Sequence, residues 1–188
     1  MPPTAGSSTA EQPRFYYDLV SPESYLVAER ALHAVGEVPE WIPVDLGGGA
    51  SFRCAAEIDA YREDVERRAA ALGLMALRWP SAWPEGDFAW ATLAATYAKW
   101  IGRGVAFSLA ALRQAFAAGR DLSEPDNVLI AAAACEMHPT AVVKGVGLES
   151  TRRLLAQSRE RAAADGVTEL PSIWIGGQVL AGERAIPA

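Results

Sequence analysis

Segments with the composition of β-strands occur only near the two ends of this chain, and that distribution limits its possible folds more than any other feature. Residues 15–20 and 41–46 are rich in aromatic and β-branched side chains, and residues 171–175 and 178–180 flank a Gly-Gly turn. Residues 55–165 carry helical spacing throughout. The order predicts an α/β fold in which a mixed sheet, built from both ends of the chain, has helices on both faces.

One short helix separates the first two strands. Residues 23–35 place apolar side chains at helical spacing, Ser21 stands where an N-cap is expected, and Pro22 stands where the first helical residue is expected. A strand, a helix and a second strand in this order favour a right-handed parallel crossover.

Helical periodicity divides the middle of the chain into six further segments. The predicted helices are residues 57–72, 88–102, 107–118, 126–136, 140–145 and 149–164. Residues 77–84, between the first two, contain two tryptophans and two prolines. Such a loop either covers the core or shapes a ligand pocket, and the sequence leaves both interpretations open.

The same pattern predicts how the chain is divided. Residues 14–50 and 148–188 should form one α/β domain, with residues 51–147 inserted as an all-helical domain. Residues 1–13 are expected to form a disordered leader, because they are rich in Pro, Ser and Thr and show no periodicity.

Charge and composition disfavour several classes of function. The formal net charge is -6, whereas nucleic-acid phosphates select basic surfaces. No apolar stretch approaches about 18 residues, the length that a membrane span needs. The N-terminus lacks the basic start and apolar core of a secretory signal. We therefore expect a cytoplasmic protein that binds neither nucleic acid nor membranes.

The sequence contains two cysteines, Cys54 and Cys135, and neither belongs to a Cys-x-x-Cys pair. In a reducing compartment a disulfide between them is not expected, and both are interpreted as free thiols. The two histidines, His33 and His138, have no neighbouring cluster of ligands, so no metal site is predicted.

The segment Ser21-Pro22-Glu23-Ser24 is the first candidate site, because it places two hydroxyls at a helix N-terminus. Unpaired backbone N–H groups and the helix dipole make such an end attractive to anions, including a thiolate. A hydroxyl there can also donate a hydrogen bond to a bound sulfur. Taken alone, a Ser-Pro pair at a helix start is more often ordinary helix capping.

Two late segments could complete this site. Pro171 precedes a predicted strand, where proline is tolerated only at an edge or a turn. If the Leu170–Pro171 bond is cis, the backbone of Leu170 would face the helix start and could pair with a peptide-like ligand. Gly182-Glu183-Arg184, after the second late strand, could hold the charged ends of that ligand.

Together these segments resemble the DsbA-like branch of the thioredoxin superfamily, and most nearly the 2-hydroxychromene-2-carboxylate isomerase and kappa-class glutathione transferase family. The residues that carry the resemblance are 17–26, 41–44, Asp64, Arg67, 72–74, 166–172 and Gly182. The resemblance implies a thioredoxin-like fold with a helical insertion, glutathione bound between the two parts, and a possible homodimer.

The resemblance also assigns roles to individual residues. Ser21 would be the catalytic residue, beside the glutathione sulfur, and the backbone of Leu170 would bind the tripeptide. The predicted cofactor-binding residues are Ser21, Pro22, Ser24, Leu170, Pro171, Gly182, Glu183 and Arg184. The thiolate would add to a small electrophile, and isomerisation would follow by bond rotation and elimination.

The sequence departs from the family pattern in ways that leave the cofactor open. The family's asparagine after the second strand has no counterpart, since the single asparagine is Asn127, and Gly182-Glu183-Arg184 is one residue shorter than the usual Gly-x-Asp-Arg. Glutathione or another low-molecular-weight thiol could serve. Two other functions stay open: disulfide exchange, which requires a thiolate nucleophile that serines cannot supply, and binding without catalysis.

Overall fold

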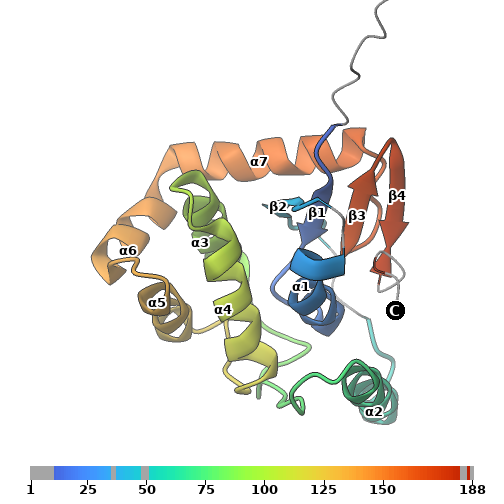
Figure 1. Cartoon of the computed structure of the whole chain (residues 1–188). Coiled ribbons are helices and arrows are strands. Elements are labelled where there is room, and N and C mark those ends of the chain that lie inside the picture. Colours follow the sequence, from blue (N-terminus) through green and yellow to red (C-terminus); the bar gives the residue numbers. More distant parts are fainter. Residues whose placement is uncertain (1–10, 35–36, 48–50, 183–185, 187–188) are drawn as a thin grey trace, which may run out of the picture.

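The computed structural model describes residues 11–34, 37–47, 51–182 and 186. Four strands form one sheet in the order β2-β1-β3-β4 (Figure 1). The strands are β1 (Arg14–Tyr17), β2 (Glu40–Pro43), β3 (Ser172–Ile175) and β4 (Gln178–Ala181). β1 runs parallel to β2 and antiparallel to β3, and β3 runs antiparallel to β4. The predicted mixed sheet, built from both ends of the chain, is therefore confirmed.

The described part of the chain contains seven helices, one for each segment that the periodicity predicts. They are α1 (Pro22–Ala34), α2 (Ala55–Ala71), α3 (Ala89–Trp100), α4 (Gly104–Phe116), α5 (Pro125–Ala134), α6 (Pro139–Gly147) and α7 (Glu149–Ala164). The predicted ends were wrong by up to three residues. α5 and α6 begin one residue early because each starts with a proline, which fits the first helical position.

The first strand is shorter than the sequence indicates, because its last predicted residues form a turn. β1 ends at Tyr17, and the side chain of Asp18 then accepts hydrogen bonds from the backbone N–H groups of Val20 and Ser21. These bonds replace the sheet ladder, and the chain turns from the strand directly into α1.

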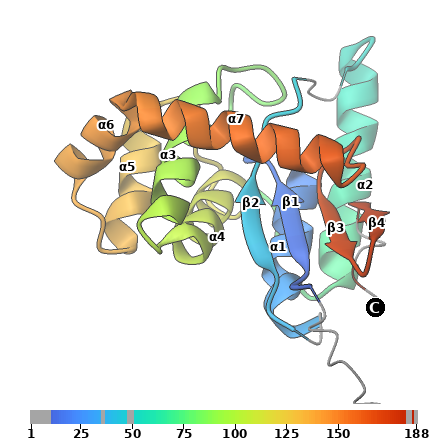
Figure 2. The same cartoon turned by 90° about the horizontal axis from the view of Figure 1, so that it is seen from above.

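Alternate side chains of the strands enter two separate cores, as the pleat requires. Phe15 and Tyr17 of β1 pack on the side of α1 and α3, together with Trp41 of β2. Tyr16 faces the opposite side, where it packs with Ala162 of α7. α7 accordingly crosses one face of the sheet while α1 lies on the other (Figure 2).

The helices between β2 and β3 share their core with the sheet. The hydroxyl of Tyr17 on β1 is hydrogen-bonded to Ser108 of α4, and both side chains are buried. Tyr25 of α1 packs against Phe116 of α4, with ring centroids 6.2 Å apart. A division into a thioredoxin-like domain and an insertion over residues 51–147 stays a prediction.

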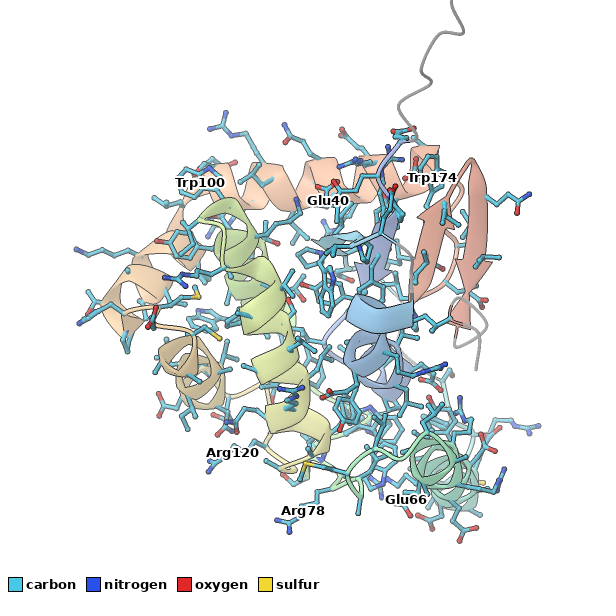
Figure 3. The ribbon with its side chains drawn as sticks, viewed as in Figure 1. Glu40, Glu66, Arg78, Trp100, Arg120 and Trp174 are labelled. Atoms are coloured by element: carbon cyan, nitrogen blue, oxygen red, sulfur yellow. The ribbon has the colours of Figure 1, made fainter. Side chains whose placement is uncertain are left out.

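A charged cluster ties the end of α7 to the sheet, on the side where Figure 3 labels Trp174. Arg14 Nη1 lies 2.9 Å from both carboxylate oxygens of Asp165, and the hydroxyl of Tyr16 donates to Asp165 at 2.5 Å. The Arg14 guanidinium also lies 4.1 Å from the ring centroid of Trp174. These contacts set the position of the loop that follows α7, which leads to the candidate site.

The predicted leader needs a correction at its end. Residues 1–10 lie outside the described residues, but Pro13 is buried, and its carbonyl accepts a 2.7 Å hydrogen bond from the backbone of Glu40. Packing against the sheet therefore begins before residue 14. No helix in the described ranges is both long and apolar enough to cross a membrane.

Candidate active site

The turn between β1 and α1 is organised around the side chain of Asp18. Its Oδ1 atom accepts hydrogen bonds from the hydroxyls of Ser21 and Ser24, the latter at 3.1 Å, and from the backbone N–H of Ser21 at 2.8 Å. The two serine hydroxyls lie 3.1 Å apart. One carboxylate thus holds both hydroxyls of the Ser-Pro-x-Ser segment.

The position of Ser21 is the predicted one, but its hydroxyl is used differently. Pro22 is the first residue of α1, so Ser21 occupies the N-cap position. Its hydroxyl bonds to Asp18 and Ser24 rather than capping a helix N–H. The N–H of Ser24 instead reaches the backbone carbonyl of Ser21 at 3.0 Å. A side-chain cap therefore does not account for this serine.

Asp18 lies in an unfavourable place for a charge. Burial raises the pKa of its carboxyl, while the hydrogen bonds from Ser21, Ser24 and Val20 act in the opposite direction. The balance makes this carboxylate a better proton acceptor than one in water.

A cavity of about 780 Å³ opens beside Ser21. It lies where the parallel strands β1 and β2 end, and the segments that follow them contribute Ser21 and Val44 to its lining. The loop before β3 contributes Thr168, Glu169 and Leu170 to the lining. The peptide bond between Leu170 and Pro171 is cis. Ser21 and Leu170, which are distant in sequence, therefore face one space.

An aromatic wall from the segment between α2 and α3 closes another side of the cavity. Trp83 lines it and donates its indole N–H to the carbonyl of Val20 at 2.9 Å. The ring of Tyr61 on α2 stacks on Trp83, with centroids 5.6 Å apart. The tryptophan-rich loop thus both covers the core and shapes the pocket, because Trp83 is buried and also lines the cavity.

Glu23, in the first turn of α1, links the helix to α2. The hydroxyl of Tyr61 donates to both of its carboxylate oxygens at 2.6 Å, and Arg68 Nη2 lies 3.0 Å from Oε1. Burial, and then the neighbouring charge of Glu23, raise the pKa of Tyr61, so its phenol stays protonated as a donor. This pairing holds α2 against the mouth of the cavity.

The predicted site residues are only partly brought together. Ser21, Pro22 and Leu170 line the cavity. Ser24 is fully buried beneath them and bonds to Ser21. Pro171 is buried too, and its carbonyl accepts a 2.8 Å hydrogen bond from the N–H of Gly182. Glu183 and Arg184 lie outside the described residues.

Sequence reasoning missed Asp18 as part of the site, although its signal was present. An aspartate that accepts hydrogen bonds from N–H groups two and three residues later forms a common turn, and Asp18 stands at that spacing from Val20 and Ser21. It also missed Trp83 as the neighbour of Val20, for which no local pattern exists.

The family model for the DSBA-like thioredoxin domain matches residues 14–188. This chain belongs to that family. The match covers the whole sheet, all seven described helices and every residue that lines the cavity. No protein with curated function matches the sequence.

Solved structures with the DSBA-like fold superpose on nearly the whole chain. A 2-hydroxychromene-2-carboxylate isomerase matches with a TM-score of 0.79 at 15% identity, covering 92% of this chain and 89% of its own. A probable DsbA oxidoreductase from Streptomyces coelicolor matches with a TM-score of 0.74 at 19% identity, covering 91% and 83%. The cytosolic disulfide reductase DsbM from Pseudomonas aeruginosa, solved with GSH, matches with 0.65 at 15%, covering 90% and 88%. At these identities the likeness concerns the fold.

The DSBA-like neighbours thus include an isomerase as well as disulfide enzymes. Disulfide exchange requires a cysteine at the site, so the positions of the two cysteines of this chain matter. Cys54 is exposed at the start of α2, and Cys135 is buried at the end of α5. Burial raises the pKa of the Cys135 thiol, which keeps it protonated. Neither cysteine lines the cavity beside Ser21.

Proposed function

We propose that this protein uses a low-molecular-weight thiol as cofactor and catalyses isomerisation or group transfer on a small electrophile. The observation that carries the proposal is that Ser21 lines the same cavity as Leu170 while its hydroxyl is hydrogen-bonded to Asp18. The thiol would lie with its sulfur at Ser21 and the N-terminus of α1, and its peptide-like part along the backbone of Leu170.

Asp18 supplies an acceptor for the proton that the thiol must lose. The S–H proton passes to Ser21 Oγ while the hydroxyl proton of Ser21 passes to Asp18 Oδ1, which it already contacts. The products are a thiolate that accepts a hydrogen bond from Ser21 and a neutral carboxylic acid. Burial, which raises the pKa of Asp18, favours this transfer.

The thiolate is the nucleophile of the reaction that follows. Addition of its sulfur to an electrophilic carbon converts a double bond of the substrate into a single bond. Rotation about that bond and elimination of the thiolate give an isomer, whereas retention of the new carbon–sulfur bond gives a conjugate. In both cases the positive end of the α1 dipole stabilises the negative sulfur.

Disulfide exchange is the second candidate, because probable and known disulfide enzymes share the fold. Exchange requires a thiolate of the protein itself. Oxygen occupies both motif positions, Ser21 and Ser24, so the cavity favours a cofactor that brings its own sulfur. Binding without catalysis is the third candidate, and a measurement of thiol-dependent turnover separates it from the proposal.

Glutathione is one thiol that fits the class, and a structural neighbour was solved with GSH. We also propose a cytoplasmic location, in line with the cytosolic neighbour DsbM, and a homodimer, in line with the resemblance given above.

The test compares Ser21→Ala with Ser24→Ala. A hydrogen bond to a charged acceptor contributes roughly 1.5–3 kcal/mol, so Ser21→Ala should lower thiol-dependent turnover of a generic electrophile or a chromene-type acid about tenfold to a hundredfold. Ser24 is fully buried and does not line the cavity, so its replacement should cost less activity. Melting curves give the folded fraction of each variant. Equal turnover by wild type and Ser21→Ala, at matched folded fraction, would rule out the catalytic assignment.

A further inference from the structure

The lining of the Ser21 cavity is strongly acidic. Among the described residues that line it, none is a lysine or an arginine. Six are acidic, namely Asp18, Glu23, Asp45, Glu85, Asp87 and Glu169. These residues come from four different segments of the chain, which only the tertiary fold brings together.

Two of these carboxylates are neutralised by arginines outside the lining. Glu23 pairs with Arg68 at 3.0 Å, and Asp45 pairs with Arg159 at 2.9 Å. Both arginines are therefore already committed to carboxylates of the protein. A third carboxylate, Asp18, is held by the two serines.

Three carboxylates at the mouth have no such counter-charge among the described residues. Glu85, Asp87 and Glu169 are exposed, and none forms a salt bridge with a described residue. Asp87 accepts a 2.9 Å hydrogen bond from the backbone N–H of Ala89 at the start of α3. Arg62 contacts the carbonyl of Trp83 at 3.1 Å but does not line the cavity.

One aromatic side chain of the same cavity adds to this preference. Phe88 lines it next to Glu85 and Asp87, whereas the ring of Trp83 already packs against Tyr61 and Arg62. Aromatic faces attract ammonium groups, and carboxylates at the mouth of a cavity raise the local concentration of cations. A ligand with a free carboxylate meets repulsion here, since like charges in a partly enclosed site are weakly screened.

We propose that this site selects thiols that carry no net negative charge, either neutral ones or ones with an amine and no free carboxylate. The inference rests on the proposed function, because it concerns the thiol that Ser21 would bind. Glutathione carries two carboxylates and one ammonium group, and ionisation of its thiol adds a further negative charge. The lining therefore opposes glutathione most strongly in the thiolate form that the reaction needs.

The experiment measures binding of three thiols by isothermal titration calorimetry at low salt. They are reduced glutathione, its diethyl ester and cysteamine. The ester keeps the peptide backbone that would pair with Leu170 but has no carboxylate, and the salt dependence of binding separates the effect of charge from that of the added ethyl groups. We expect the ester to bind about tenfold more tightly than glutathione, and the difference to shrink as salt is added.

A double variant, Glu85→Gln with Glu169→Gln, should reduce this preference at least threefold. Glu149→Gln is the matched control, since Glu149 is exposed at the start of α7 and does not line the cavity. Glutathione binding as tightly as its ester would overturn this inference and leave the proposed function standing. Failure of all three thiols to bind, in a folded protein, would overturn both.

Discussion

Replacing Asp18 with asparagine tests the proposed proton transfer most directly. Asparagine has nearly the same shape, and its oxygen can still accept the 2.8 Å bond from the N–H of Ser21. It cannot take up a proton, however, so the thiol loses the acceptor that it reaches through the Ser21 hydroxyl. The variant therefore separates proton transfer from the shape of the turn.

The expected loss follows from the contacts of Asp18. The carboxylate of Asp18 accepts the Ser21 hydroxyl proton, and a positioned proton acceptor of this kind typically contributes about a hundredfold or more to the rate. We expect kcat/KM at neutral pH to fall about a hundredfold. The loss should shrink above about pH 8.5, where an ordinary thiol ionises without help.

The assay is the rate of thiol conjugation to a generic electrophile as a function of pH, with the ultraviolet absorbance of the bound thiolate as a second readout. Asp126→Asn is the control, because Asp126 is exposed at the start of α5 and does not line the cavity. A folded Asp18→Asn protein with the wild-type rate at every pH, and the same bound thiolate signal, would refute the relay.

Asp18→Asn should also change how the free energy of unfolding depends on pH. Because burial raises the pKa of Asp18, the folded state holds this proton at a pH where the unfolded chain has released it. The free energy of unfolding of the wild type should therefore fall, relative to Asp18→Asn, as pH rises from about 4 through the raised pKa. Urea titrations at a series of pH values measure this difference, and a difference that grows with pH would contradict the assignment.

Two further predictions concern sulfur chemistry and stability. The double variant Cys54→Ala with Cys135→Ala should keep its thiol-dependent turnover, and neither it nor the wild type should reduce insulin disulfides; reductase activity that disappears with a cysteine would instead favour disulfide exchange. Asp165→Ala should lower the free energy of unfolding by about 2–3 kcal/mol in urea titrations, less than a fully stranded buried charge costs, because Glu11 and Trp174 still contact Arg14. A change below about 0.5 kcal/mol would show that Asp165 is not needed to hold Arg14.

Local sequence patterns were sufficient to predict the order of the helices and strands and the part of the site around Ser21. The aromatic run before Ser21 and the helical spacing after Pro22 are properties of neighbouring residues, so they could be read directly. The end of β1 could not be predicted in this way, because residues 15–20 all have the composition of a strand. The strand ends at Tyr17 because the N–H groups of Val20 and Ser21 donate to the side chain of Asp18.

The charge of the cavity lay beyond sequence reasoning for a different reason. Glu85 and Glu169 belong to loops that are far apart in the sequence and approach one another only after the helices pack. The same holds for Trp83, whose contact with Val20 spans 63 positions of the chain. Such contacts depend on tertiary packing and cannot be predicted from the periodicity of the sequence.

The hydrogen bond from Trp83 to Val20 has a consequence for how such a protein can diversify. It anchors the aromatic wall to the backbone one residue before Ser21, so the wall and the reactive turn share a fixed point yet come from separate stretches of chain. Exchanging residues 84–88 between relatives would alter which molecules enter while the anchor keeps the serine in place. Substitutions in residues 84–88 can therefore change the selectivity of this cavity without changing the residues at the reactive turn.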